Sequence, residues 1–363
     1  MSKGQKHKNS LIKYTDEFTG KRVTKLTPER CVNHHQYFYN KMFTSDSNYL
    51  IYGSDRDGNR NLYKMNIING DAVQLTEGNG INDFGSILSN DDKYLFFTRN
   101  NTIYKMNLDT LDEVPIYQEP KEWSSRTFDI SDDNRFIAMT QIYKKDIIEG
   151  KGDWSSFEPQ WRKKPLCRIV YFDIENNKGN VILEQNCWFG HPQIRPGNND
   201  TILFCHEGPG NLIDARLWLI NSDGSNRRCA REKSENELVT THEFWLRDGS
   251  KFGFMYREKD QKTFLKFINP DTLEENTLME CSHYLHFISN REGSMITGDG
   301  DSFIYIIDVA NKKEEKLCFH GSHWKSYGNT QDSHPHPCFT PDSMSVLFTS
   351  DKDGLPSIYK VDL

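Results

Sequence analysis

A short pattern of apolar and polar residues recurs along the chain. An apolar residue is followed by a polar turn containing Asp and then by an alternating, β-rich segment, as in the stretches that begin at Phe43, Leu88, Ile130, Leu246 and Phe339. Alternation over about four to eight residues between turn signals is typical of half-buried strands. The pattern predicts an all-β protein built from repeated units.

The spacing of these segments indicates the size of the repeat. A further strand is expected in most units, at residues 61–66, 102–107, 168–173, 216–221, 303–308 and 357–362. The turn acids Asp46, Asp91 and Asp132 lie 45 and 41 residues apart, which is typical of a four-stranded propeller blade. We count seven units, at about residues 36–80, 81–122, 123–186, 187–238, 239–282, 283–330 and 331–363.

The two ends of the chain complement each other. The seventh unit has only three expected strands, whereas residues 20–27 have the pattern of a strand without a unit of its own. Pairing this strand with the last blade would close the ring and remove exposed sheet edges. The sequence therefore predicts a seven-bladed β-propeller, a single domain over residues 1–363, whose ring is closed by an N-terminal strand.

Composition narrows the class of protein. Aromatic residues make up 12% of the 363 residues, and no run approaches the ~18 apolar residues that span a bilayer. Acidic residues outnumber basic ones by 52 to 45, and the net charge of −7 argues against a nucleic-acid partner. The polar N-terminus lacks an apolar signal segment, and the eight cysteines form no C-x-x-C pair. We expect a cytoplasmic protein with no membrane partner, and the sequence indicates no particular oligomeric state.

Histidine recurs at one position of the repeat. Counting back five residues from the turn in four consecutive units gives His191, His242, His286 and His336, although the chain has only 12 histidines. The equivalent positions in the first three units are Asn40, Gly85 and Arg126. The imidazoles either form a hydrogen-bonded lining of the channel or converge as metal ligands and catalytic groups. We favour the second interpretation, because four of so few histidines share one position.

A possible metal site lies near the C-terminus. His334 precedes His336 by two residues, so both side chains point to the same face of an expected strand, and Gln331 stands just before them. Three imidazoles with one amide oxygen and no thiolate suit manganese, iron or zinc better than calcium. A six-coordinate ion held in this way would keep open positions for substrate oxygen and could act as a Lewis acid.

Further candidates are isolated residues and one insertion. Arg216 could bind a substrate carboxylate or pair with Asp214, and His206 lies in the same connection. His34 and His35 precede the first unit and could line the same funnel or the surface. The insertion at residues 144–166 contains Trp, Phe and Arg, and it is either a lid over the funnel mouth or a surface loop without function.

Several motifs together resemble the oligogalacturonate lyase family. They include Thr241-His242-Glu-Phe-Trp, Phe204-Cys-His206-Glu-Gly-Pro with Asp214-Ala-Arg216-Leu-Trp, and Gln331-x-x-His334-Pro-His336-Pro. Shorter motifs of the same set are Gly190-His191-Pro, Leu75-Thr-Glu-Gly, Gly298-Asp-Gly and Tyr37-Phe-Tyr. The resemblance runs in order from about residue 13 to residue 363.

The resemblance implies a cytoplasmic, seven-bladed enzyme of pectin catabolism. Its reaction would be β-elimination of short oligogalacturonides, such as digalacturonate and trigalacturonate, to give 4,5-unsaturated uronates. On matching positions, Mn²⁺ (or another divalent transition metal) would be held by His286, Gln331, His334 and His336. His242 would be the base, and Arg216 would bind substrate. Candidate substrate-binding residues besides these are His191, His206, Arg126, His34 and His35.

The implied chemistry agrees with these residue types. The proton at C5 of a uronate is weakly acidic, so a metal ion and an arginine on the carboxylate would stabilise the enolate-like charge. A neutral imidazole would then remove the proton. Because the base must be neutral, we expect a pH optimum on the alkaline side.

Three alternative functions stay open at this point. A non-catalytic propeller could bind a sugar or a protein, although such a scaffold needs no set of in-register histidines. A metal-dependent hydrolase could use the same funnel, but its product would carry no conjugated double bond. A lyase acting on a different uronate is the third, because His35-Gln36 stands where the family is expected to have Arg-Asn.

Overall fold

The computed structural model describes residues 2–28, 30–150 and 153–363. The chain divides into two compact units, Met1–Pro115 with Ser282–Leu363 (unit 1) and Ile116–Cys281 (unit 2). Both are built almost entirely of antiparallel strands. Among the described residues, no helix combines the length and the apolar character that crossing a membrane requires.

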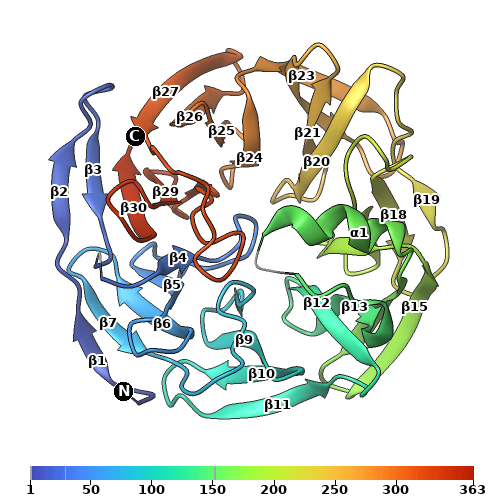
Figure 1. Cartoon of the computed structure of the whole chain (residues 1–363), viewed down its shortest axis with the longest axis horizontal. Helices are drawn as coiled ribbons and strands as arrows, with labels where there is room; N and C mark the ends of the chain where they lie inside the picture. The colour runs from blue at the N-terminus through green and yellow to red at the C-terminus, as the bar shows by residue number, and fades with distance from the viewer. Residues whose placement is uncertain (1, 29, 151–152) are drawn as a thin grey trace. The chain divides into compact units, whose positions relative to one another are not determined.

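Unit 1 holds four sheets, with the strand orders β1-β7-β6-β5-β4, β11-β10-β9-β8, β24-β25-β26-β27 and β2-β3-β30-β29-β28 (Figure 1). The last residues of β11 belong to unit 2. The strands of the first two sheets are β1 (Lys6–Lys8), β4 (Asn33–His35), β5 (Tyr49–Ser54), β6 (Asn61–Asn66), β7 (Asp71–Gln74), β8 (Ile87–Leu88), β9 (Tyr94–Arg99), β10 (Thr102–Asn107) and β11 (Glu113–Gln118). Those of the other two are β2 (Ile12–Thr15), β3 (Arg22–Lys25), β24 (Tyr284–Ser289), β25 (Met295–Gly300), β26 (Phe303–Asp308), β27 (Lys313–Phe319), β28 (Cys338–Phe339), β29 (Ser345–Ser350) and β30 (Ser357–Asp362).

Unit 2 holds three sheets, each with its strands in chain order, β12 to β15, β16 to β19 and β20 to β23. The strands are β12 (Trp123–Ile130), β13 (Phe136–Tyr143), β14 (Leu166–Asp173), β15 (Lys178–Asn186), β16 (Phe189–Ile194), β17 (Thr201–His206), β18 (Leu217–Asn221), β19 (Arg228–Cys229), β20 (Glu237–Trp245), β21 (Phe252–Glu258), β22 (Thr263–Ile268) and β23 (Glu275–Cys281). Between β13 and β14 lie two short 3₁₀ helices, η1 (Lys144–Asp146) and η2 (Trp154–Ser156), and the helix α1 (Phe157–Arg162).

The seven sheets are the blades of a β-propeller, which confirms the fold predicted from the sequence. The N-terminal strand expected at residues 20–27 is β3, and it pairs with β30 from Val23↔Val361 to Lys25↔Tyr359. Figure 1 shows the dark blue β2 and β3 beside the red β30. The ring is therefore closed by the N-terminal segment, as predicted.

The N-terminal segment also forms two strands that the sequence pattern does not predict. β2 pairs with β3, and β1 pairs with β7 from Lys6↔Val73 to Lys8↔Asp71. Both strands are short and mostly exposed, so their sequences lack the apolar alternation that predicts a half-buried strand. They add a fifth strand to two blades of unit 1 and cover edges that would otherwise be open.

The recurring turn is held by a hydroxyl and a carboxylate. The Thr44 hydroxyl donates to Asp46 at 2.6 Å and accepts the backbone N–H of Tyr49 at 3.0 Å. The same pair of contacts recurs at Ser89/Asp91, Ser131/Asp133 and Thr340/Asp342. In the third predicted blade, residues 123–186, the turn acid is thus Asp133. The Asp132 chosen from the sequence pairs instead with Arg247 at 2.7 Å.

The apolar residues of the repeat pack between neighbouring blades. In unit 1, Leu50, Tyr63 and Leu347 belong to one buried cluster that joins the first and last sheets. In unit 2, Ile169 and Phe204 join two blades in the same way. This packing fixes the strands from which the candidate functional residues extend.

Candidate functional site

The recurring histidines lie at irregular positions of their strands. The first strand of four blades contains a β-bulge, between Ser125 and Phe128, Gly190 and Gln193, Thr241 and Phe244, and Tyr284 and Phe287. His191 and His242 are the first bulged residues, with φ of 49° and 56°, whereas His286 is the second. Bulges re-aim side chains and are common beside functional sites. For three of the four histidines the position counted in the sequence therefore corresponds to a shared bulge, offset by one residue at His286, whereas His336 lies before β28 and outside any bulge that the described strands show.

Three of the predicted histidines come together in unit 1. The ligand atoms of His286, His334 and His336 all lie within 4.8 Å of one another, and the three residues are buried. The ring centroids of His286 and His336 are 4.1 Å apart. His286 extends from β24, and the other two lie in the segment that precedes β28. Buried, convergent imidazoles of this kind can hold a transition metal.

Asp299 on β25 orients His286. One carboxylate oxygen lies 2.7 Å from His286 Nδ1, and the other accepts the backbone N–H of His286 at 2.7 Å. Burial by itself would raise the pKa of Asp299, but the charge of His286 and these bonds hold it below its ordinary value. The contact favours the proton on Nδ1, which leaves Nε2 as the nitrogen suited to a metal.

Gln331 lies next to the histidines in the sequence and carries a buried polar atom. Its Oε1 has no hydrogen-bond partner among the described residues. Its backbone carbonyl accepts the N–H of His334 at 3.1 Å. Burial, reinforced by His286, lowers the pKa of His334 to about 3, so this imidazole is neutral at physiological pH. A neutral imidazole and a buried, unsatisfied carbonyl oxygen are both suited to a metal.

His34 and His35 lie behind this segment and are about 1% exposed. His34 Nε2 is 2.9 Å from Asp83, and His35 Nε2 is 3.1 Å from the carbonyl oxygen of Pro335. Burial lowers the pKa of His35 to about 4. The His35 contact supports the segment that carries His334 and His336, and the burial of both imidazoles argues against the substrate contact expected of them.

Gln36, at the position where the sequence departs from the family pattern, is also buried. Its Nε2 donates to the carbonyl oxygen of Asp83 at 3.0 Å, and its Oε1 accepts the N–H of Ser86 at 2.9 Å. The side chain thus joins two blades of unit 1. In this chain the position has a structural role.

Arg216 is held by two glutamates in unit 2. Its Nε donates to Glu243 at 3.0 Å, its Nη2 donates to Glu207 at 3.1 Å, and its side chain is 5% exposed. Burial would raise the pKa of Glu243, but the charge of Arg216 holds it below its ordinary value. The pairing with Asp214 considered from the sequence does not occur in the described part of the chain.

His191 completes this cluster. Its Nε2 lies 3.2 Å from Glu207 and its Nδ1 lies 3.7 Å from Glu243. Ligand atoms of His191, Cys205 and Glu207 also lie within 4.8 Å of one another, but the neighbouring Arg216 opposes the binding of a cation there. Sequence reasoning missed both glutamates, although each directly follows a candidate histidine, His206 or His242.

The remaining predicted residues differ in their surroundings. His206 stacks on Trp218 with ring centroids 4.7 Å apart, and burial lowers its pKa to about 4. His242 is partly buried on its bulge. Arg126, also on a bulge, is exposed and forms no ion pair with any residue that the structure describes. Arg126 is thus available to an anionic ligand.

The insertion at residues 144–166 is a packed element within unit 2, although residues 151–152 lie outside the described part of the chain. Phe157 packs on Trp188 at a centroid distance of 5.2 Å. Gln160 is buried and bonds to the backbone of Asp146 and Ile148 at 2.9 and 2.8 Å. A Cβ added to Gly208 would lie 2.2 Å from Trp161, so this indole rests on the connection that follows Glu207.

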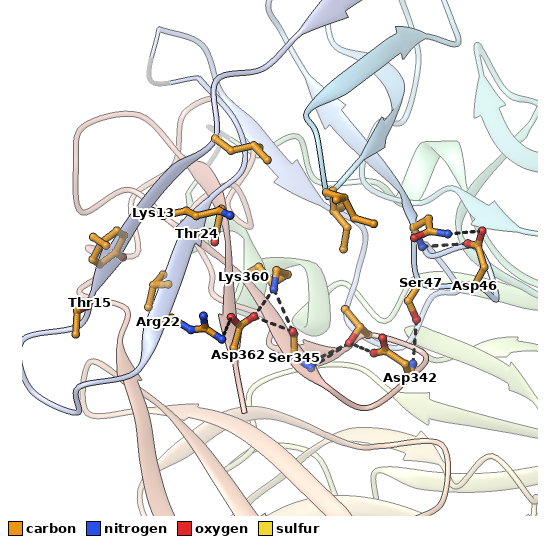
Figure 2. Close-up of a pocket in the computed structure, with 17 residues that line it drawn as sticks. Lys13, Thr15, Arg22, Thr24, Asp46, Ser47, Asp342, Ser345, Lys360 and Asp362 are labelled. Atoms are coloured by element: carbon orange, nitrogen blue, oxygen red, sulfur yellow. Dashed lines mark hydrogen bonds and ion pairs between the residues drawn. The ribbon is translucent and has the colours of Figure 1, made fainter.

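A pocket of about 470 Å³ lies elsewhere in unit 1, and Figure 2 shows it. Its charged groups include Lys13, Arg22, Lys360, Asp342 and Asp362. Lys360 and Arg22 both pair with Asp362. None of the candidate site residues lines it, and it contains no histidine. We therefore do not assign it to the functional site.

The fold and the site define a β-propeller protein with a buried three-histidine centre and a glutamate-held arginine. The family model of oligogalacturonate lyase matches residues 1–363. The chain belongs to the oligogalacturonate lyase family.

Named relatives agree over nearly the whole length. An oligogalacturonide lyase of Pectobacterium atrosepticum is 37% identical over 380 aligned residues, which cover 99% of this chain and 97% of the relative. A solved structure of an oligogalacturonate lyase in complex with manganese superposes with a TM-score of 0.97 at 38% identity, covering 100% of this chain and 98% of that one. An oligogalacturonate lyase of Vibrio parahaemolyticus gives a TM-score of 0.94 at 39% identity, with coverage of 99% and 98%.

Proposed function

We propose that this protein is an oligogalacturonate lyase that cleaves digalacturonate and trigalacturonate by β-elimination. The product would carry a 4,5-unsaturated uronate. The observation that carries the proposal is the buried triad of His286, His334 and His336 beside Gln331, in a chain that belongs to this family throughout. A non-catalytic scaffold has no use for three buried imidazoles with an unsatisfied amide oxygen.

These four residues would hold Mn²⁺. The donor set, three imidazole nitrogens and one amide oxygen without thiolate, suits a borderline divalent ion. The buried Gln331 Oε1 has no other partner among the described residues, and one solved relative was determined with manganese. When bound, the ion supplies positive charge that stabilises the developing negative charge of the substrate carboxylate.

In unit 2, His242 would remove the C5 proton and Arg216 would bind a carboxylate. The observed hydrogen bonds of Arg216 use Nε and Nη2, and Nη1 makes none with a described residue. Glu207 and Glu243 fix the guanidinium plane, so Nη1 presents its N–H groups in a fixed direction. This arrangement orients the carboxylate relative to the base, which saves reorganisation during proton transfer.

Arg126 would supply the attraction for the anionic substrate. The two glutamates already balance the charge of Arg216, and the whole chain has a net charge of −7. Surrounding groups partly bury the Arg126 guanidinium and lower its pKa, but the residue keeps exposed surface and has no ion-pair partner among the described residues, so it can attract a uronate. His191 would contribute by its contacts with Glu207 and Glu243, the two residues that hold Arg216. His206 would contact substrate only as a neutral imidazole, because burial lowers its pKa.

We also propose that the protein works in the cytoplasm. All eight cysteines are free thiols. Thiols in this number remain reduced in a reducing compartment, whereas secreted proteins usually pair them.

The proposed reaction is tested by the absorbance of the unsaturated product. The protein is incubated with digalacturonate, and ultraviolet absorbance and new reducing ends are followed together. A lyase gives both signals at the start of the reaction, because each cleavage creates one double bond and one reducing end. Initial rates are compared, because the unsaturated monomer has a free anomeric hydroxyl and later opens to a keto acid without this absorbance. New reducing ends without absorbance would indicate a hydrolase, and neither signal would indicate a different uronate or a binding protein.

A further inference from the structure

Arg60 connects a turn of one blade to the segment that carries the proposed metal ligands. It lies directly before β6, and it forms a two-pronged ion pair with Asp332, with Nη1 2.5 Å from Oδ1 and Nη2 2.8 Å from Oδ2. Asp332 is 1% exposed. In the sequence, Asp332 stands between Gln331 and His334, so the ion pair holds the backbone between two proposed ligands.

Asp332 also folds the segment onto itself. Its Oδ2 accepts the backbone N–H groups of Tyr327 and Asn329 at 3.1 and 2.9 Å. Arg60 Nη2 donates in addition to the carbonyl oxygen of Tyr327 at 3.0 Å. The guanidinium thus bridges both ends of a short loop, residues 327–332, which leads directly into the histidines.

The charges around Arg60 are balanced within a buried network. Asp83 lies 3.7 Å from Arg60 and 2.9 Å from His34. The Arg60 guanidinium and the His34 imidazole therefore face the carboxylates of Asp83 and Asp332. A Cβ added to Gly53 would lie 2.6 Å from His34 and 2.9 Å from Asp83, so only glycine leaves room for this pair. Removal of Arg60 would leave Asp332 as a buried carboxylate without its cation, which is strongly unfavourable unless the segment moves.

We infer that Arg60 is a positioning residue for the metal centre, and that its fork-like ion pair with Asp332 sets the affinity of Gln331 and His334 for Mn²⁺. The inference rests on the proposed metal site. Groups that orient ligands typically change metal affinity by about 10- to 100-fold when they are removed. His286 does not depend on this segment, because Asp299 on the adjacent strand holds it.

The test compares Mn²⁺ binding to metal-free protein for wild type, Arg60→Gln and Arg60→Lys. We expect the Gln variant to bind Mn²⁺ about 10- to 100-fold more weakly by electron paramagnetic resonance titration. The Lys variant keeps the charge but loses the fork, so its affinity should also fall. If Arg60→Gln does not fold, the Lys variant decides the test by itself.

Arg99→Gln is the matched control. Arg99 is 21% exposed, close to the 24% of Arg60, and it pairs with Glu113 away from the histidines. Thermal stability without metal should fall in both Gln variants, and further at Arg60 because Asp332 is more buried than Glu113, whereas Mn²⁺ affinity should change only at Arg60. Equal Mn²⁺ affinity in Arg60→Gln, Arg60→Lys and the control would overturn the inference. Wild-type protein that binds no Mn²⁺ would instead contradict the proposed function, so the two failures are distinguishable.

Discussion

At the scale of the residue, acidic side chains fix the direction of the groups that would do the chemistry. Asp299 holds His286 through both its ring and its backbone, and Glu243 holds Arg216 through Nε. Each partner lies close in the fold to the group that it orients, and Glu243 shares a bulge with His242. Small displacements of these carboxylates would therefore move the proposed metal ligand or the proposed substrate contact.

Two alanine substitutions should separate metal binding from proton transfer. His336→Ala removes one of three buried imidazoles, so both bound Mn²⁺ and turnover should be lost. His242→Ala should keep about one Mn²⁺ per chain and lose at least about 100-fold in turnover, because general-base catalysis contributes that much or more. Metal content by elemental analysis and product absorbance provide the measurement. Full activity of the His242 variant, or unchanged metal content of the His336 variant, would refute the corresponding role.

Asp129 should make stability depend on pH. Its carboxylate accepts the N–H of Ile194 at 2.7 Å, and burial raises its pKa from 3.8 to about 7. A raised native pKa favours the protonated form, so this stabilisation is complete below about pH 4 and is lost as the pH rises through 7. Asp129→Asn is neutral at every pH, so its melting temperature relative to wild type should increase between pH 5 and pH 8.

Asp133→Asn is the control for this effect. Hydrogen bonds from Ser131 and Arg135 hold the pKa of Asp133 below its ordinary value despite partial burial. Its contribution is complete above the unfolded pKa and is lost only in acid, so the variant should differ from wild type by a constant amount between pH 5 and pH 8. A constant difference for Asp129→Asn as well would show that this carboxyl does not titrate in that range.

At the scale of the element, the N-terminal segment covers the outer edges of two blades in unit 1. β1 pairs with β7, and β2 pairs with β3, which closes the ring with β30. In the turn between β2 and β3, Asp16 accepts the N–H of Phe319 at 3.0 Å, and Thr19 donates to the carbonyl oxygen of Leu317 at 2.9 Å. The segment thus holds several strands that are distant in the sequence.

Deletion of residues 2–15 should therefore destabilise the protein and expose sheet edges. We expect the melting temperature to fall by about 3 to 8 °C and aggregation on heating to increase. Lys8→Gln is the control, because it removes only an exposed ion pair with Asp71, which is worth little. Scanning calorimetry with light scattering measures both effects, and a deletion variant indistinguishable from Lys8→Gln would contradict this role.

Elements can be predicted from the sequence where their signal is local. Alternating apolar residues mark the strands of the blades, and a hydroxyl-carboxylate turn such as Thr44 with Asp46 marks four of them. β1 and β2 carry no such signal, because they bind an existing edge by backbone hydrogen bonds and bury little side-chain surface. The insertion is recognisable from its length, but its packing through Phe157 on Trp188 depends on tertiary contacts.

At the scale of the whole molecule, the repeat itself makes the histidines recognisable. Equivalent strand positions recur in each blade, so counting along the sequence is enough to identify His191, His242, His286 and His336. The partners of these residues cannot be found in this way. Arg60 and Asp332 are 272 residues apart, and the repeat pattern does not distinguish Asp332, Glu207 or Asp299 among 52 acidic residues.

The central claim is that a manganese ion held by His286, Gln331, His334 and His336 is needed for β-elimination. The most direct test is to titrate Mn²⁺ into metal-free protein and to measure bound ion and the initial rate of product absorbance with digalacturonate in the same samples. The proposed site predicts a rate that rises in proportion to occupancy and saturates at one ion per chain. A rate independent of occupancy, or saturation without any unsaturated product, would contradict it.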